Sequence, residues 1–596
     1  MIRSFFNGGL MEKWFIKQKN RDLFPKTDLD LFQKAKLSIL FNRDIVDIKD
    51  ISDYTLIPDT LLNDANLLPD ADKFFDLIDR AIENKEKIYI VGDYDCDGIM
   101  STSIFIKTLR RVGIDVDFRI PNRIEDGYGI NSDIVSEIYD SGARIIITCD
   151  NGVQAFDACN KAKELGMDIL ITDHHELKIE DGKDILPESI GVINPHRIDS
   201  KYHFKELCGA GVVYKLCIEL LNKNNITDTI LRRELIAFAA IATICDVVDL
   251  KHENRYIVKH GLLELRNTNN IGLNKLIEVS GVKKEKIDTY AIGFILGPRF
   301  NASGRLEVAD AGISLLLSDD EDEANSIANH LNELNEERKS LTEEGYKKAV
   351  DIIENKKLGD DLSDLVIVEY IEDTHESVAG IIAGRIKEKY HRPTIILTDG
   401  KEGVKGSGRS IEGFNLFEAI SPISDMLVKF GGHEMACGLS IEKYKIDVFR
   451  DKLNERAKLM NIDLDKKVEV DMIFPIAMAD MRLLEMINSF KPFGKANPEP
   501  LFADVNLIVK GIRVFGQNRN VIKINFIDQA GGSREVVLFE PKDVFLDKLN
   551  KLGYKDINSL INQNKLVMDI VYYPKENDYR DIKTVDIVVK HYRFRG

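Results

Sequence analysis

A repeated pattern, an apolar run followed by a loop rich in acidic or histidine residues, constrains the fold of this chain more than any other feature. It occurs in KIYIVGDYDCDG, RIIITCDNG and DILITDHHE, and a helical stretch leads into a similar segment, CDVVDL, at Cys245. Short apolar runs separated by helical stretches predict strand–helix–strand units and a parallel sheet. The carboxyl ends of parallel strands meet at one edge, where open α/β sheets bind their ligands. We therefore expect an α/β fold with a doubly wound parallel sheet and its polar loops at that edge.

The loop side chains are suited to divalent cations. A single Asp at a strand end is more often a turn residue or a helix cap. Three alternating Asp after one strand are harder to explain in that way, because clustered carboxylates raise one another's pKa unless cations neutralise them. Of the adjacent His174 and His175, one could be a ligand and the other a core or phosphate contact. With Asp150 and Asp246 the set has enough donors for two ions that activate water to hydrolyse a phosphate ester.

Composition excludes several other classes of protein. The chain has 596 residues, enough for several domains, and 44% hydrophobic with 30% charged residues is typical of soluble globular proteins. No apolar run reaches the roughly 18 residues of a membrane span, and the N-terminus lacks the pattern of an export signal, so we expect a cytoplasmic protein. The seven cysteines form no CxxC pair. We expect them to be reduced, with Cys96, Cys149 and Cys245 packed in the core.

Charge is distributed unevenly along the chain. The net charge of -17 speaks against a protein that coats duplex nucleic acid with a uniformly basic surface. Residues 501–596, however, contain 16 Lys and Arg against 12 Asp and Glu, a balance of +4. Any nucleic acid must therefore bind to a local basic patch.

The pattern of elements predicts five regions. An N-terminal extension over 1–50 packs on the core, and the α/β catalytic domain covers 51–318. Apolar residues at helical spacing amid many charges predict a long connecting helix over 319–357, which we expect to be a solvated spacer. A smaller α/β domain follows over 358–458, and the short strand signals within 459–596 suit a small β-barrel.

Several segments together resemble a known family. GDYDCDG, IPNRIEDGYG, TCDNG, TDHHE, INPH, LCGAGV, CDVVDL, PRFNASGR, GSGRS, GGHEMACG and PFGKANPEP occur in the order found in the RecJ single-strand-specific DNA exonucleases. These belong to the DHH phosphoesterases, whose name describes the triplet Asp173, His174 and His175. The resemblance covers nearly the whole chain. It implies a DHH catalytic domain, a DHHA1-type second domain and an OB-like C-terminal barrel.

The resemblance also implies a ligand set for two Mn²⁺ or Mg²⁺ ions. The implied ligands are Asp93, Asp95, Asp97, Asp150, His174, His175 and Asp246, and the implied catalytic residues are Asp95, Asp97, Asp150, His174, His175 and Asp246. Asp173 would orient a neighbour instead. Two features depart from relatives. Val91 stands where some carry a His, which leaves Asp93 as its substitute, and the turn that usually reads GxGN is here Gly494, Lys495, Ala496 and Asn497.

Substrate contacts are expected in both α/β domains. Arg123, Arg305 and Arg409 are phosphate candidates because the guanidinium fork donates in pairs, although a surface Arg is the usual alternative. Tyr128 could stack on a base or simply pack in its glycine turn, and His433 could bind substrate or be a buried, hydrogen-bonded imidazole. The full expected set is Arg123, Tyr128, Asn301, Ser303, Arg305, Ser407, Arg409, Gly431, Gly432 and His433.

The function that the resemblance implies is a 5′ to 3′ exonuclease of single-stranded DNA. It would release 5′-mononucleotides by two-metal hydrolysis in DNA repair and recombination, as a monomer that meets a single-strand-binding protein and a helicase. One alternative is a DHH phosphoesterase of short oligonucleotides or cyclic dinucleotides, although these usually lack the extra barrel. An alternative of another class is a non-catalytic replication scaffold, against which the intact set of Asp and His argues.

Overall fold

The computed structural model of the chain describes residues 12–25, 28–123, 125–356, 364–400, 403–516, 518–528, 531–553, 556–579 and 582–595. These residues form two compact units. The central unit consists of residues 57–463 and 494–496, and the terminal unit consists of 1–56, 464–493 and 497–596. None of the described helices is long and apolar enough to span a membrane.

The central unit begins with a five-stranded parallel sheet. Its strand order is β3-β2-β4-β5-β8, with bounds Val116–Arg119, Ile88–Val91, Ile145–Cys149, Asp168–Thr172 and Gly191–Ile193. The chain enters in β2, adds β3 on one side and then continues from β4 on the other. The direction of winding therefore changes between β2 and β4, the position at which doubly wound sheets bind ligands. The predicted sheet is confirmed.

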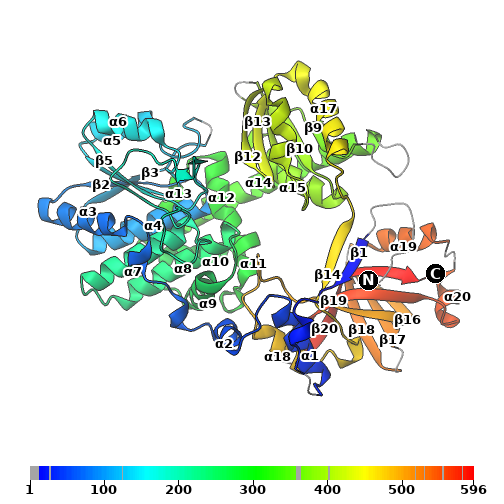
Figure 1. The fold of residues 1–596 in the computed structure, drawn as a ribbon. Helices are drawn as coiled ribbons and strands as arrows, with labels where there is room; N and C mark the ends of the chain where they lie inside the picture. The colour runs from blue at the N-terminus through cyan, green and yellow to red at the C-terminus, as the bar shows by residue number, and fades with distance from the viewer. Residues whose placement is uncertain are drawn as a thin grey trace. The chain divides into compact units, whose positions relative to one another are not determined.

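Helices cover both faces of this sheet. In β4, Ile145 and Ile147 lie in one hydrophobic core, which includes α3 (Ala71–Asn84) and α4 (Cys96–Arg111). Ile146 points to the other core, which includes α5 (Ser132–Asp140) and α6 (Phe156–Glu164) (Figure 1). Successive side chains of a strand face opposite ways, so a run of isoleucines fits a strand that is buried on both faces.

A helical layer completes the first domain. Its helices are α7 (Gly209–Lys223), α8 (Thr229–Cys245), α9 (His252–Arg266), α10 (Ile271–Ser280), α11 (Thr289–Ala291), α12 (Gly297–Leu306) and α13 (Asp310–Leu317). A π-helix, Ile292–Leu296, joins α11 to α12. Asp228 caps α8 by accepting a hydrogen bond from the backbone N–H of Leu231 at 3.1 Å, and residues 235–243 are buried throughout. The apolar α8 thus fixes the position of Asp246, its C-cap residue.

The long helix α14 (Glu321–Lys356) is more than a spacer. Ala324, Ala328 and Leu331 pack in the first core, and Ala349 and Ile353 pack in the core of the next domain. The expectation of a solvated helix that serves only as a spacer is therefore wrong. Small and apolar residues at helical spacing form a buried stripe that the many charges of the segment obscure in the sequence.

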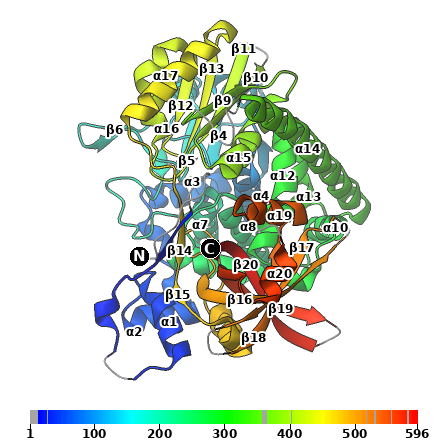
Figure 2. The same ribbon diagram turned by 90° about the vertical axis from the view of Figure 1, so that its right-hand side faces the viewer.

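A second sheet, mixed in direction, follows α14 (Figure 2). Its order is β12-β13-β11-β10-β9, with bounds Leu427–His433, Ala436–Ile441, Gly403–Arg409, Thr394–Gly400 and Ile367–Tyr370. Only β9 and β10 are parallel. The helices of this domain are α15 (Ala379–Tyr390), α16 (Leu416–Ile420) and α17 (Ile446–Leu459), and residues 357–363 lie outside the described part.

The terminal unit contains a small barrel. Its strands pair in the order β16-β17-β18-β20-β19, and β19 also pairs with β16, which returns the sheet to its first strand. Their bounds are Phe502–Phe515, Val521–Ile527, Ser533–Phe539, Ile582–Arg595 and Val567–Tyr579. The unit also contains β1 (Glu12–Ile16), β14 (Lys466–Val470), β15 (Met472–Ile473), α1 (Leu31–Phe41), α2 (Ile48–Leu56), α18 (Met481–Asn488), α19 (Lys542–Lys551) and α20 (Ile557–Asn562). The N-terminal segment belongs to this unit, since Ile39 and Phe41 share the barrel's core and β1 pairs with β14.

Candidate metal centre and substrate site

The loop after β2 and the first turn of α4 hold three of the predicted ligands. Asp95 is the N-cap of α4, and its carboxylate accepts hydrogen bonds from the backbone N–H groups of Asp97 at 2.9 Å and Gly98 at 3.2 Å. The Asp97 carboxylate accepts from the N–H groups of Gly209 and Ala210, both at 2.7 Å, at the start of α7. Two helix N-termini therefore hold these carboxylates and favour their negative charge.

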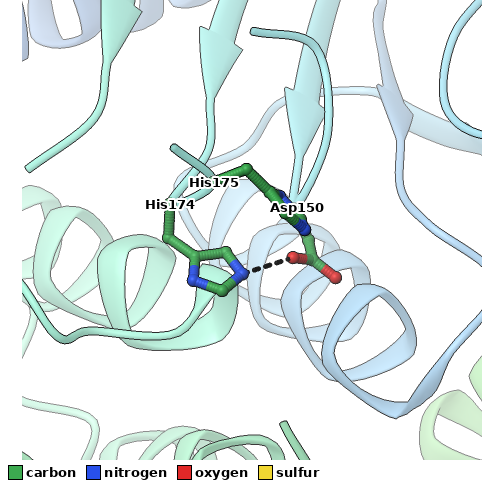
Figure 3. Close-up of side chains that lie close together, drawn as sticks. All are labelled: Asp150, His174 and His175. Carbon is green, nitrogen blue, oxygen red and sulfur yellow. Dashed lines mark ion pairs between the residues drawn. The ribbon is translucent and has the colours of Figure 1, made fainter. Parts of the chain in front are cut away.

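Asp150 and His174 follow two neighbouring strands, β4 and β5. The Asp150 backbone has φ of 61°, in the left-handed region that costs a non-glycine residue free energy and is found more often at functional sites. Its N–H donates to the carbonyl of Thr172 at 3.1 Å, which fixes this conformation. Oδ1 of Asp150 lies 3.1 Å from Nε2 of His174. A dashed line marks this pair in Figure 3. The parallel register of β4 and β5 therefore brings the two loops together.

All seven predicted ligands lie in one cluster. Oδ2 of Asp246 and Oδ2 of Asp97 are each 3.7 Å from Nε2 of His174. The ligand atoms form three groups in which all atoms lie within 4.8 Å of one another: Asp97 with His174 and Asp246, Asp93 with Asp95 and Asp150, and Asp150 with His174 and His175. The cluster is at the carboxyl edge of the sheet, where its direction of winding changes.

The donor atoms fit a pair of divalent cations. Two buried atoms of the cluster, Oδ1 of Asp93 and Nε2 of His174, make no hydrogen bond within the described part of the chain, although Nε2 of His174 lies 3.1 Å from Oδ1 of Asp150. A buried polar atom without a partner is costly, so such an atom needs an explanation, for example an ion. Carboxylate oxygens are preferred by Mg²⁺ and Mn²⁺, and imidazole is an accepted ligand of transition metals. The cluster therefore has both the donors and the unsatisfied atoms expected of a metal centre.

Asp173 orients the neighbouring imidazole. Its carboxylate is buried and accepts hydrogen bonds from the backbone N–H groups of Val153 at 3.0 Å and His174 at 2.7 Å. Its Oδ1 lies 2.7 Å from Nδ1 of His175. Nε2 of His175 lies 3.2 Å from the hydroxyl of Tyr128, which also donates to the carbonyl oxygen of Asp150. Tyr128 thus contacts the cluster through its hydroxyl, while the residue is 55% exposed.

Electrostatic repulsion inside the cluster is strong. Burial, followed by the charges of Asp97 and Asp95, raises the pKa of Asp246 to about 8. Burial and then the charge of Asp97 also raise the pKa of Asp150 well above its usual range. Burial alone would lower the pKa of His175, but the hydrogen bond and charge of Asp173 outweigh it and raise that pKa to about 9. Without cations, the cluster therefore retains protons at neutral pH.

The metal-free protein should lose stability as pH rises from 7 to 9. Because the folded-state pKa values of Asp246 and His175 are raised above their unfolded values, the folded state binds more protons in this window, and its free energy of unfolding falls as they dissociate. The opposite effect of His174, whose pKa is lowered to about 3 by burial, is confined to lower pH. Thermal unfolding in EDTA at a series of pH values measures how the free energy of unfolding changes with pH. In the Asp246→Asn variant the free energy of unfolding should fall less steeply with pH than in the wild-type protein. A fall as steep as in the wild type, or a rise, would contradict this prediction.

Three guanidinium groups lie near one another beside the cluster. Burial lowers the pKa of Arg305 to about 10, and the positive charges of Arg123, Arg338 on α14 and Arg409 act in the same direction. Nη1 of Arg305 donates to the carbonyl of Ser377 at 2.9 Å, so it links the two α/β domains. Nη1 of Arg409 donates to Oγ of Ser407 at 3.1 Å. Three cations that repel one another favour an anionic ligand between them.

A groove of about 550 Å³ adjoins these groups. It is lined by Arg123 and Tyr128 from the first domain and by residues of the second, including Ser407, Lys429 and Gly431. The groove thus contains four of the expected substrate contacts.

The remaining expected contacts differ in accessibility. Asn301 accepts a hydrogen bond from the backbone N–H of Cys96 at 2.8 Å, and the fully buried Ser303 donates to the carbonyl of Phe300 at 2.7 Å. Both side chains hold the protein's own backbone. Gly432 has φ of 145°, and a Cβ there would lie 2.4 Å from the carbonyl oxygen of Ala436. His433 is exposed, so it is not the buried imidazole of the alternative interpretation.

Two glycines outside the predicted set of site residues determine the shape of the cluster. A Cβ on Gly98 would lie 2.2 Å from the backbone oxygen of Asp93, and a Cβ on Gly209 would lie 2.6 Å from Cβ of Asp150. Both positions therefore require glycine for close packing around the ligands. They occur in GDYDCDG and LCGAGV, but the sequence alone does not reveal that the two segments meet.

Comparisons with known proteins agree with this architecture. The chain matches family models for the DHH family N-terminal domain over residues 87–243, the DHHA1 domain over 364–459 and the RecJ OB domain over 470–591. It is 32% identical over 548 residues to the single-stranded-DNA-specific exonuclease RecJ of Haemophilus influenzae, covering 88% of this chain and 91% of that protein. The chain belongs to the RecJ family. The predicted family and the three-domain fold class are thereby confirmed.

Other RecJ proteins are covered to different extents by the match. The Bacillus subtilis protein is 38% identical over 459 residues, 76% of this chain, but the match spans only 56% of that relative's length. A crystal structure of RecJ from Thermus thermophilus in complex with Mn²⁺ has the same fold, with a TM-score of 0.76 and 24% identity over 94% of this chain and 76% of that one. A manganese-bound exonuclease RecJ aligns with a TM-score of 0.58 at 29% identity, covering 68% of this chain and 99% of that one. Manganese in that relative agrees with the predicted Mn²⁺ or Mg²⁺ cofactor.

Proposed function

We propose that this chain degrades single-stranded DNA from its 5′ end and releases 5′-mononucleotides by hydrolysis that requires two divalent cations. The observation that carries the proposal is the convergence of seven Asp and His side chains, with unsatisfied buried atoms, beside Arg305 and the groove lined by Arg123 and Tyr128. The names of the RecJ relatives support the substrate and the exonuclease reaction. The direction follows from the family resemblance.

The groups of side chains suggest a division of roles. Asp93, Asp95 and Asp150 would hold one ion, and Asp97, His174 and Asp246 the other. Asp150 also groups with His174 and His175, which makes it the candidate bridge between the ions. When bound, such ions lower the pKa of the attacking water and neutralise the charge that develops on the phosphate. The protein contributes the fixed positions of the carboxylates and, through Asp173, the orientation of His175.

The arginines would bind the 5′ end. A terminal phosphate between Arg123, Arg305 and Arg409 would relieve their mutual repulsion and receive charge-assisted hydrogen bonds. Recognition of the terminal phosphate would place the first phosphodiester near the cluster, which explains exonuclease rather than endonuclease action. His433 and the glycines before it would form the exposed rim of this site.

The barrel would bind another part of the same strand. Cross-strand pairing puts Phe515 and Phe539 on either side of Val521, and both phenylalanines are exposed. Arg513 and Lys523 lie 5.9 and 5.8 Å from the Phe515 ring centroid. Exposed rings flanked by cations suit the bases and phosphates of single-stranded DNA.

Cellular context is part of the same proposal. We infer that the protein is a monomer in the cytoplasm with a role in DNA repair and recombination. It would meet a single-strand-binding protein and a helicase. For the domain organisation we propose the five regions with the boundaries predicted above. These inferences are supported by the family membership and by the electrostatic difference between residues 501–596 and the rest of the chain.

A length series tests the function against its alternatives. Purified protein is given 5′-phosphorylated single strands of 2 to about 40 nucleotides, with Mn²⁺ or with EDTA. We expect metal-dependent mononucleotide release that becomes more efficient on longer strands, because the barrel adds contacts. Equal or faster cleavage of dinucleotides would favour an enzyme of short oligonucleotides. No hydrolysis at any length would favour the non-catalytic scaffold.

A further inference from the structure

Two stacked aromatic rings are exposed in the helical segment before α12. Tyr290 lies in α11 and Phe294 in the π-helix, with ring centroids 4.9 Å apart and ring planes at 27°. They are 63% and 69% exposed, whereas the adjacent Ile292 and Leu296 are buried in the core. The segment is therefore anchored by its apolar face, and its rings form a rigid aromatic surface that the fold itself does not use.

This segment packs against the end of the helix that carries Asp246. A Cβ on Gly293 would lie 3.5 Å from Ile244, and a Cβ on Gly297 would lie 2.2 Å from Sγ of Cys245. Asp246 is the next residue along the chain and the C-cap of α8. The two glycines thus bring the backbone of the aromatic segment close to a predicted metal ligand. π-helical turns of this kind occur frequently at functional sites.

We propose that Tyr290 and Phe294 form a stacking platform for an unpaired base of the DNA strand that is cut at the metal centre. The inference rests on the proposed nuclease function and adds a substrate contact to it. A strand bound at the cluster must continue past it, and the platform belongs to the segment that packs against the end of α8, next to Asp246. An aromatic face binds bases of any sequence, and it suits a neutral base beside carboxylates that repel phosphate.

The platform would also contribute to strand selectivity. Bases stacked and paired within a duplex do not offer their faces to a side chain, whereas the bases of a single strand do. Stacking beside the cluster would therefore favour a strand that enters unpaired. This contribution is independent of the cations and should remain in their absence.

Direct binding tests the platform separately from hydrolysis. The double variant Tyr290→Leu/Phe294→Leu keeps apolar side chains at both exposed positions but removes the rings. We expect its Kd for a fluorescent 20-nucleotide single strand, measured in EDTA at fixed salt, to rise about 10-fold. The variant Tyr290→Phe/Phe294→Tyr keeps an aromatic ring at both positions, so it should bind the strand as tightly as the wild-type protein does. Tyr444→Leu is the matched control, since Tyr444 is 75% exposed in the second α/β domain and stacks on no ring within the described residues.

Kinetics with Mn²⁺ supply a second measurement. In the leucine double variant kcat/KM should fall because KM rises while kcat stays the same. This loss should grow with strand length from the dinucleotide upward. Unchanged binding of the 20-nucleotide strand, or an equal loss in Tyr444→Leu, would overturn the platform. If the wild-type protein binds single strands without hydrolysing them in Mn²⁺, the proposed function fails, and the binding comparison still decides the platform.

Discussion

Replacing Asp150 with Asn should abolish hydrolysis and at the same time stabilise the metal-free protein. Asp150 belongs to two of the three ligand groups, so its loss weakens both ion sites, and we expect kcat to fall by about 1,000-fold or more with Mn²⁺. Its carboxylate is buried among Asp93, Asp95 and Asp97, which raise its pKa after burial itself. Asn is neutral at every pH, so it removes both the repulsion and the cost of keeping this buried carboxyl protonated, and the unfolding temperature in EDTA should rise.

The matched control is Asp157→Asn. Asp157 is exposed in α6, seven residues further along the same chain segment, and this variant should keep both activity and unfolding temperature. Opposite signs for activity and metal-free stability distinguish a ligand from a structural Asp, whose loss would lower both. Retained activity in Asp150→Asn would remove this residue from the mechanism.

Replacing Arg409 with Gln should reduce activity only on strands that carry a 5′ phosphate. Burial lowers the pKa of Arg409 and the charge of Arg123 acts in the same direction, so a terminal phosphate gains by binding there. Charge-assisted hydrogen bonds contribute about 1.5–3 kcal/mol each, so we expect kcat/KM to fall by about 10- to 100-fold. Strands with a 5′ hydroxyl should be much less affected. Arg409→Lys should recover little, because an ammonium lacks the planar fork.

The substrate comparison provides an internal control, and Arg144→Gln provides a second one. Arg144 is exposed and directly precedes β4, at the opposite edge of the sheet from the cluster, where its guanidinium lies 4.0 Å from the centre of the Tyr139 ring. The Arg144→Gln variant should degrade strands with a 5′ phosphate and strands with a 5′ hydroxyl as the wild-type protein does. Equal losses on phosphate and hydroxyl ends in Arg409→Gln would show that this residue supports the fold and does not bind the end.

Local sequence patterns predicted the sheet and the cluster well. The isoleucine runs of β2, β4 and β5 and the Asp or His after each are signals within a few residues, and parallel pairing then brings Asp95, Asp150 and His174 together. Asp246 was less certain from the sequence, because it follows a helix. Its position depends on the burial of α8, which the apolar run indicated but could not orient.

Features that depend on contacts distant in sequence could not be predicted. The buried stripe of α14 joins two cores, but the many charges of this helix hid the stripe. The sequence did not indicate that Tyr128 contacts His175 through its hydroxyl, that Ser303 bonds to its own helix, or that the N-terminal segment shares the barrel's core. Each depends on the packing of segments far apart in the chain, on which periodicity carries no information.

Crystals grown with Mn²⁺ and measured at a wavelength where manganese scatters anomalously provide the most direct test of the central claim. We expect two anomalous peaks about 4 Å apart, both contacted by Asp150, one near Asp93 and Asp95 and the other near His174 and Asp246. Well-ordered crystals with no peak within this cluster, or with manganese held only by other residues, would contradict it.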